Sequence, residues 1–262
     1  MHPILFTLGS FELASYGLMT ALAYAVASFY LYKRLPLIKL DKDTFWNIVF
    51  IAFMAALVGA KLLYLIVSWP EMGTTWAQRL GTAIKDFRYG FVFFGGAIAA
   101  IGAVVYYLKR KKLPLLPTGD FFMVALPLGH AIGRVGCFLA GCCFGHPTTL
   151  PWGVAFTDPH SLVAREYLGV ALHPTQLYEV AADLILFFIL QHMYKKTHKN
   201  SAIVAAYVIG YGVIRFGIEF FRGDFRGEYI GMFSPSQLIA LLALAAGAAL
   251  WWFLKKDTSH AG

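Results

Sequence analysis

The sequence predicts an all-α membrane protein that crosses the bilayer about seven times. Hydrophobic residues make up 59% of its 262 positions and charged residues only 14%, a balance far from that of a soluble domain. Apolar stretches of about 20 residues, the length that spans about 30 Å of hydrocarbon, recur along the chain. A polytopic helical bundle is therefore expected, and the few ionisable residues inside the stretches become the candidates for function.

The predicted spans follow one another at short intervals, at residues 16–32, 45–68, 91–108, 120–138, 175–194, 202–221 and 233–254. The fourth is the least regular, because Pro127, His130 and Arg134 interrupt it. No soluble domain is visible, so residues 1–262 are expected to form a single transmembrane domain with long loops at about 69–90 and 139–173. The first span lacks a basic segment before it and a small-residue cleavage site, so we expect it to be retained rather than removed as a signal peptide.

Basic residues follow every second span and give the expected orientation. The clusters after the first, third, fifth and seventh spans are Lys33, Arg34, Lys39 and Lys42; residues 109–112; Lys195, Lys196 and Lys199; and Lys255 and Lys256. The positive-inside rule puts that side in the cytoplasm, with the N-terminus outside and the C-terminus inside. The net charge of +8 then reflects topology and attraction to anionic lipid, and no nucleic-acid partner is expected.

A polar heptad, HPTQLYE, stands at residues 173–179, where the fifth span begins. Proline and threonine open a helix there, and Tyr178 and Glu179 are carried into the apolar run that follows. A charge at the centre of a membrane helix costs about 2.5–3.5 kcal/mol on insertion scales, so such a residue is a candidate functional residue. Taken alone, the heptad is also compatible with an interfacial helix cap.

Ionisable residues within the spans follow helical faces. His130, Arg134 and Cys137 are spaced i, i+4, i+7 in the fourth span, and a second series lies in the sixth at i, i+4, i+8, i+11. That second series is Tyr211, Arg215, Glu219 and Arg222. Isolated pairs of this kind are often structural. Two helices that each direct arginine inward instead predict a buried anion site, because the planar guanidinium binds phosphate at two points and stays charged when buried.

Glycines mark two further places. Gly95 and Gly96 open the third span, and the ordinary explanation for such a pair is close helix packing. A denser group surrounds Arg134, at Gly133, Gly136, Gly141 and Gly145. Because glycine disfavours helix, we expect the helix to end by Cys137. The irregular backbone beyond it would then form a cavity wall, which is tolerated at membrane depth.

All three cysteines, Cys137, Cys142 and Cys143, lie in this glycine-rich stretch. With His146 they form C-x4-C-C-x2-H, a set of soft ligands whose spacing differs from the usual zinc patterns. We therefore expect no metal ligands and no cofactor. A disulfide in an oxidising compartment, small apolar packing and a reactive thiol remain open interpretations.

A series of motifs extends along almost the whole chain, from Tyr16 to about Leu242. They are SYGLM at 15–19, FGG at 94–96, GRVG at 133–136, HPTQLYE at 173–179, GYGVIR at 210–215, IEFFR at 218–222 and SPSQL at 234–238. Together they resemble the bacterial prolipoprotein diacylglyceryl transferase family. The resemblance implies a seven-span inner-membrane enzyme whose active site faces the outer, periplasmic side. It implies transfer of diacylglycerol from phosphatidylglycerol to the lipobox cysteine of a pre-lipoprotein, with a thioether formed and glycerol phosphate released, as the first step of lipoprotein maturation.

The resemblance also implies roles for particular residues. Arg134 and Arg215 would hold and neutralise the lipid phosphate, and His173 would lie at the mouth of the cavity. The other phospholipid-contacting or site-shaping residues would be Tyr16, Gly95, Gly96, Tyr178, Glu179, Tyr211, Glu219 and Arg222. The chemistry needs a substrate thiolate and fixed positive charge near the departing phosphate, and no metal.

This sequence departs from the family pattern at two places. Phe94 stands where the family often has a histidine considered as the thiol-activating base, and Cys137 stands where asparagine is common. Since phenylalanine takes no proton, we expect another base or none, and His130, one turn before Arg134, is the candidate; a core or capping role is its alternative. A non-catalytic or transport paralogue with a lipid-phosphate pocket, and a metal- or thiol-handling protein, are the alternatives for the whole chain.

Overall fold

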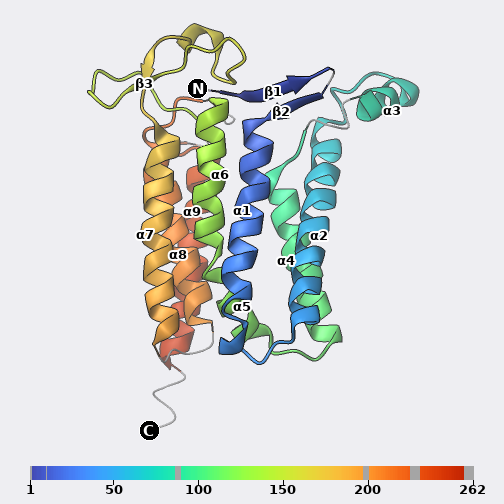
Figure 1. Ribbon diagram of the computed structural model, residues 1–262, viewed down its shortest axis with the longest axis vertical. Coiled ribbons are helices and arrows are strands. Elements are labelled where there is room, and N and C mark those ends of the chain that lie inside the picture. The colour runs from blue at the N-terminus through green and yellow to red at the C-terminus, as the bar shows by residue number, and fades with distance from the viewer. Residues whose placement is uncertain (1, 10, 86–89, 197–200, 225–230, 257–262) are drawn as a thin grey trace. The chain divides into compact units, whose positions relative to one another are not determined.

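The computed structural model describes residues 2–9, 11–85, 90–196, 201–224 and 231–256 (Figure 1). It confirms the all-α class. Within these residues, six helical segments are long and apolar enough to span a membrane: α2 (Lys42–Ser68), α4 (Phe93–Arg110), the stretch Leu115–Ala140, α7 (Thr175–Lys195), α8 (Ala202–Glu219) and the part of α9 from Pro235 to Leu254. Helix α1 (Ser15–Tyr32) coincides with the first predicted span but is not one of these six, so a count of seven stays a prediction. Lys199 lies outside the described residues.

The chain divides into two compact units, residues 34–118 and the remainder. In the remainder, the helices pack as a series in which α1 contacts α6 (Leu126–Ala140), α6 contacts α7, α7 contacts α8, and α8 contacts α9 (Pro235–Lys256). A hairpin of β1 (Ile4–Leu8) and β2 (Phe11–Ala14) precedes α1. Helices α6, α7 and α8 thus lie in neighbouring positions (Figure 1), and they carry most of the predicted site residues.

The predicted loop 139–173 has a small structure of its own. Strands β3 (Val154–Ala155) and β4 (Ala171–Leu172) pair in antiparallel fashion, and a short 3-10 helix, η2 (Arg165–Tyr167), lies between them. Phe144, Phe156, Val163 and Leu172 form a buried cluster beneath them. This core holds the segment that joins α6 to α7 in a defined position.

The unit of residues 34–118 contains η1 (Leu35–Leu37), α2, α3 (Trp76–Lys85) and α4. Helices α2 and α4 approach so closely that a Cβ on Gly59 or Gly95 would overlap the backbone of the other helix, and one on Gly96 would lie 2.8 Å from the Ala56 carbonyl oxygen. Such contact requires glycine, because small residues let membrane helices approach through their backbones. Close packing is therefore the local role of Gly95 and Gly96.

Three boundaries differ from the sequence-based prediction. The fourth span is two helices, α5 (Leu115–Met123) and α6, divided just before Pro127. Helix α6 does not end by Cys137 but continues to Ala140, and Gly141 closes it with a left-handed φ of 79°. Helix α8 ends at Glu219, so Arg222 lies beyond it. The expectation of an early end to α6 was wrong because Gly136, within the helix, packs against Met19 of α1, and such packing offsets the low helix propensity of glycine.

Candidate functional site

The first charged pair of the site joins α6 to α7. Arg134 Nη2 lies 2.8 Å from a carboxylate oxygen of Glu179, whose side chain is 1% exposed. One turn further along α7, the carboxylate of Asp183 is buried and makes no hydrogen bond within the described part of the chain. Two buried acidic groups on one helix face thus stand beside a single arginine, an arrangement that holds a positive charge in place.

The second pair lies on α8 and is completed by α9. Arg215 Nη2 contacts the Glu219 carboxylate at 2.7 Å across one helical turn and also donates to Ser236 Oγ at 3.1 Å. Ser234 Oγ donates to the other oxygen of Glu219 at 2.8 Å. The two serines of the SPSQL motif therefore fix the ion pair, a role that was not predicted for them.

Arg222 belongs to the chain after α8 and not to its helical face. Its guanidinium makes two hydrogen bonds of 2.7 Å to Asp224, and its backbone forms an isolated bridge with Gly145. A Cβ on Gly145 would lie 2.6 Å from the Phe221 carbonyl oxygen, so glycine is required there. This contact joins the end of α8 to the loop that follows α6.

The polar heptad forms hydrogen bonds to the loop that follows α6. Thr175 Oγ1 donates to the Cys143 carbonyl oxygen and Gln176 Nε2 donates to the Cys142 carbonyl oxygen, both at 2.7 Å. The backbone of His173 pairs with the loop as well, since its carbonyl accepts from Gly145 N at 3.0 Å. The heptad is therefore more than an interfacial cap: its first residues order the loop and its last residue, in α7, holds Arg134.

Two residues of the heptad, His173 and Tyr178, form a hydrogen-bonded aromatic group with Trp152. Tyr178 Oη accepts from Trp152 Nε1 at 2.8 Å and lies 3.0 Å from His173 Nδ1. The rings of His173 and Tyr178 both pack on Phe221. Trp152 carried no signal in the sequence that would have placed it here.

Tyr211 connects the two arginine pairs. It interacts electrostatically with Glu179, Arg134 and Arg215, and its ring lies 5.3 Å from that of His130. His130 is largely buried, and its Nδ1 makes no hydrogen bond within the described residues. Arg134, Arg215, Tyr211 and His130, which were predicted from two separate spans, therefore do lie in one region.

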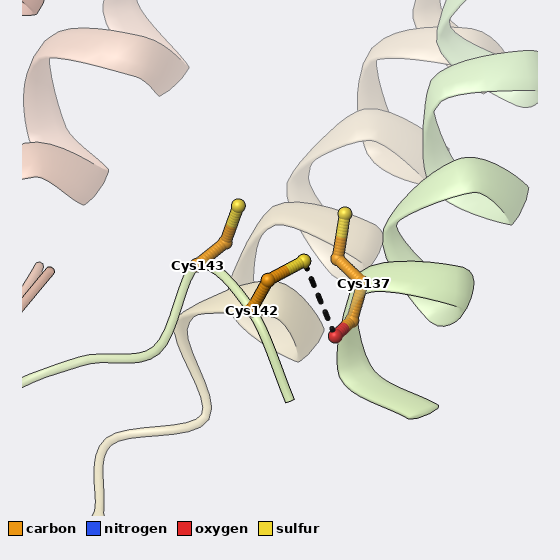
Figure 2. A group of neighbouring side chains, drawn as sticks. All are labelled: Cys137, Cys142 and Cys143. Atoms are coloured by element: carbon orange, nitrogen blue, oxygen red, sulfur yellow. Dashed lines mark hydrogen bonds between the residues drawn. The ribbon is translucent and has the colours of Figure 1, made fainter. Parts of the chain in front are cut away.

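The three cysteines lie next to Arg134. Figure 2 shows Cys137 on the last turn of α6 and Cys142 and Cys143 in the loop after it, with their sulfur atoms gathered together. Each pair of sulfurs lies within 4.8 Å, and Arg134 Nη1 lies 4.0 Å from Cys137 Sγ. Hydrogen bonds shared among the three thiols lower the pKa of Cys143 and raise the pKa of Cys142. This is the one group of three or more side chains with metal-ligating atoms that the described residues bring together.

Several other predicted residues are described separately from this cluster. Gly95 and Gly96 belong to the unit of residues 34–118 and pack on α2. Phe94, beside them, is 46% exposed. Tyr16, at the start of α1, is 48% exposed and interacts electrostatically with Cys137. His146, the fourth member of the cysteine pattern, is exposed and is not part of the sulfur group.

Comparison with known proteins gives a consistent result along the whole chain. The family model described as prolipoprotein diacylglyceryl transferase matches residues 3–253. A phosphatidylglycerol–prolipoprotein diacylglyceryl transferase of Clostridium tetani is 36% identical over 94% of this chain and 95% of its own length. Proteins of the same description are 32% identical in Finegoldia magna, over 98% of this chain and 97% of the relative, and 30% identical in Thermotoga maritima, over 93% and 81%.

Proposed function

Since this chain belongs to the prolipoprotein diacylglyceryl transferase family, we propose that it is a membrane-embedded transferase acting on phosphatidylglycerol and prolipoproteins. It moves the diacylglyceryl group of the lipid to the lipobox cysteine of the prolipoprotein, in the first step of lipoprotein maturation. The observation that carries the site assignment is the pairing of Arg134 with Glu179 and of Arg215 with Glu219, linked through Tyr211.

The arginines suit the charge that the reaction develops. The acceptor thiolate attacks the terminal glyceryl carbon of the diacylglycerol, a C–S bond forms, and the C–O bond to phosphate breaks. The electron pair of that bond leaves with glycerol phosphate, whose phosphate gains negative charge. Arg134 and Arg215 stabilise this charge, because donors fixed in a water-poor site act most strongly where charge develops.

The remaining residues orient the arginines or border the site. Glu179 and Glu219 hold the two guanidinium groups by ion pairs, and Arg222 is the third cation of the region. Tyr178 and His173, hydrogen-bonded to one another, border its entrance, and Tyr16 contributes from α1. Contact of the lipid with Gly95 and Gly96 stays a prediction, since the local role of both is packing on α2.

His130 is the candidate for the base that takes the thiol proton. Its buried position against the ring of Tyr211 is equally that of a core histidine, so the two roles need a direct test. A His130→Ala variant that keeps full transfer activity removes it from the mechanism.

The function is tested in a bacterial strain depleted of its own transferase. This protein should restore diacylglycerol modification of a lipobox reporter, measured as a mass increase of the reporter. Arg134→Ala and Arg215→Ala should each abolish it, while Arg165→Ala, which removes an exposed arginine from η2, should not. Absence of modification by inserted, folded protein would overturn the proposal in favour of a non-catalytic paralogue.

The expected location is the bacterial inner membrane, with the site on the outer side. The basic clusters that follow alternate spans support this orientation through the positive-inside rule. A reporter fused to the C-terminus that is active only in the cytoplasm tests it. The fused reporter is expected to be active, and an inactive reporter would indicate the opposite orientation.

A further inference from the structure

The three cysteines form a cluster that the transfer reaction described above does not use. They are all the cysteines of the chain, none is in a disulfide, and their sulfur atoms lie within 4.8 Å of one another (Figure 2). We propose that Cys137, Cys142 and Cys143 bind one thiophilic cation of the zinc class as three thiolates, with its remaining coordination position open to a fourth thiolate.

The spacing of the sulfurs fits such an ion. Zinc–sulfur bonds of about 2.3 Å put the sulfurs of one ion about 3.8–4.0 Å apart in tetrahedral or trigonal geometry. The separations of up to 4.8 Å close to that range by side-chain rotation. The sequence spacing C-x4-C-C differs from the usual zinc patterns, but the turn after α6 compensates for it by bringing the loop cysteines back to Cys137.

The loop is held in this shape independently of any ion. Gly141 turns the chain at the end of α6 with a φ of 79°, and Cys142 N donates to the Cys137 carbonyl oxygen at 3.2 Å. Thr175 and Gln176 fix the carbonyls of the two loop cysteines. Cys143 itself adopts a φ of 65°, a left-handed conformation that is unfavourable for a residue with a Cβ. Ligands fixed by such surroundings are what a pre-organised metal site needs.

Cationic side chains lie near the sulfurs. Three thiolates and a divalent ion carry a net charge of about −1, which is costly to bury unless it is paired. Arg134 Nη1 lies 4.0 Å from Cys137 Sγ, and Arg222 interacts electrostatically with Cys143. Each arginine also has a carboxylate partner, so the two are positive neighbours of a loaded site and not an excess of unpaired charge.

Three protein ligands leave one position of a tetrahedral ion open, which is the arrangement of catalytic rather than structural zinc. A thiol that binds such an ion loses its proton outright. On the proposed function, on which this step rests, the acceptor cysteine would be the fourth ligand. The ion would supply the acidity that releases the thiol proton to water, while Arg134 would stay beside the departing phosphate. Transfer would then need no protein base.

The cation site is tested by binding alone, without reference to transfer. The whole protein in detergent micelles, reduced and freed of metal, is titrated with Cd²⁺ while the ultraviolet charge-transfer absorption of metal-bound thiolate is followed. One equivalent of Cd²⁺ per chain is expected to saturate the signal, and an excess of Zn²⁺ should compete with Cd²⁺ for the site. Because the chain has no other cysteine, the signal has no other source.

Variants separate the cluster from its surroundings. The triple Cys→Ser variant should give no signal, and Cys137→Ser should weaken binding at least tenfold. The matched control His146→Gln changes the exposed fourth member of the sequence pattern and should bind like the natural chain. Should the cysteine variants fail to fold, the natural chain still decides: bound Zn²⁺ should protect three thiols from a maleimide, counted by mass. Absence of saturable binding and of protection overturns the site.

Transfer activity tests the fourth ligand separately. Removal of Zn²⁺ by a chelator should lower the transfer rate at least tenfold, and one equivalent of Zn²⁺ should restore it. Saturable binding with an unchanged rate overturns the acceptor as fourth ligand. Saturable binding without transfer under any condition overturns the proposed function and leaves the cation site standing.

Discussion

Helices α6, α7 and α8 bury charged side chains against one another, whereas α2 and α4 bring their backbones together through glycine. In the first region Glu179 is fully buried and paired with Arg134, and Arg215 and Glu219 are buried with it. In the second, the contact leaves no space for a Cβ on Gly59 or Gly95. Both arrangements hold membrane helices together, but only the charged one puts ionisable groups between the helices.

The difference matters because helices gain little from hydrophobic burial inside lipid. A glycine contact gains dispersion energy and stays inert. A buried ion pair gains little over apolar packing, so its presence in α6, α7 and α8 is explained better by chemistry than by stability.

The largest effect on stability and on transfer is expected from Glu179→Ala. The change leaves Arg134 buried without its partner, which costs about 3–5 kcal/mol. Thermal unfolding in micelles measures the loss of stability, and the lipobox reporter should show loss of transfer. Glu166→Ala, at an exposed position in η2, is the control.

A double variant sharpens this test. Arg134→Met combined with Glu179→Leu replaces the pair by apolar side chains, which is often neutral or stabilising. We expect stability to return and transfer to stay absent. Restored transfer would contradict a catalytic role for the pair.

The next largest effect on stability is expected at the close glycine contact between α2 and α4. Gly95→Ala should destabilise the chain by about 1–3 kcal/mol, because its Cβ overlaps the backbone of Gly59 and overpacking of a close contact costs that much. Gly102→Ala, on the same helix and facing open space, should be neutral or slightly stabilising, since alanine favours helix. Equal effects in unfolding measurements would remove close packing as the reason for Gly95.

Features set by local periodicity could be predicted from the sequence. Hydropathy located the membrane-length helices to within a few residues but did not predict α3, which lies inside the expected loop at 69–90. The spacing of His130, Arg134, Tyr211 and Arg215 predicted that they share one region, because helical periodicity fixes which side chains share a face. The division of the fourth span escaped prediction, since Pro127 marks a break without deciding whether the helix bends or stops.

Contacts between segments distant in the sequence could not be predicted from the sequence alone. The bridge between Arg222 and Gly145 and the hydrogen bonds from Thr175 and Gln176 to the cysteine loop depend on where the loop returns after α6. Such returns follow from tertiary packing and not from local periodicity. The gathering of the three sulfurs is a consequence of them, which is why the linear cysteine spacing predicted no metal ligands.

Thr175→Val tests the loop clamp, the link between the heptad and the cysteines. The valine keeps the volume but leaves the Cys143 carbonyl without the donor that now lies at 2.7 Å, at a cost of about 1–2 kcal/mol. Thr20→Val is the matched control, because its hydroxyl bonds an exposed carbonyl within α1, and surface changes of this kind stay within about 0.5 kcal/mol. If the two variants unfold at the same temperature, the heptad does not hold the loop.

The smallest effect on stability is expected from Trp152→Phe, which tests the aromatic group of Trp152, His173 and Tyr178. The variant loses the 2.8 Å hydrogen bond from the indole to Tyr178 Oη, worth about 0.5–1 kcal/mol at this exposed position. With Tyr178 less firmly held, we expect KM for phosphatidylglycerol to rise two- to fivefold and kcat to stay unchanged, as for a residue that only positions the substrate. Trp76→Phe, which changes an exposed tryptophan of α3, should alter neither. A fall in kcat with constant KM would instead put Trp152 and Tyr178 among the groups that act on the reacting atoms.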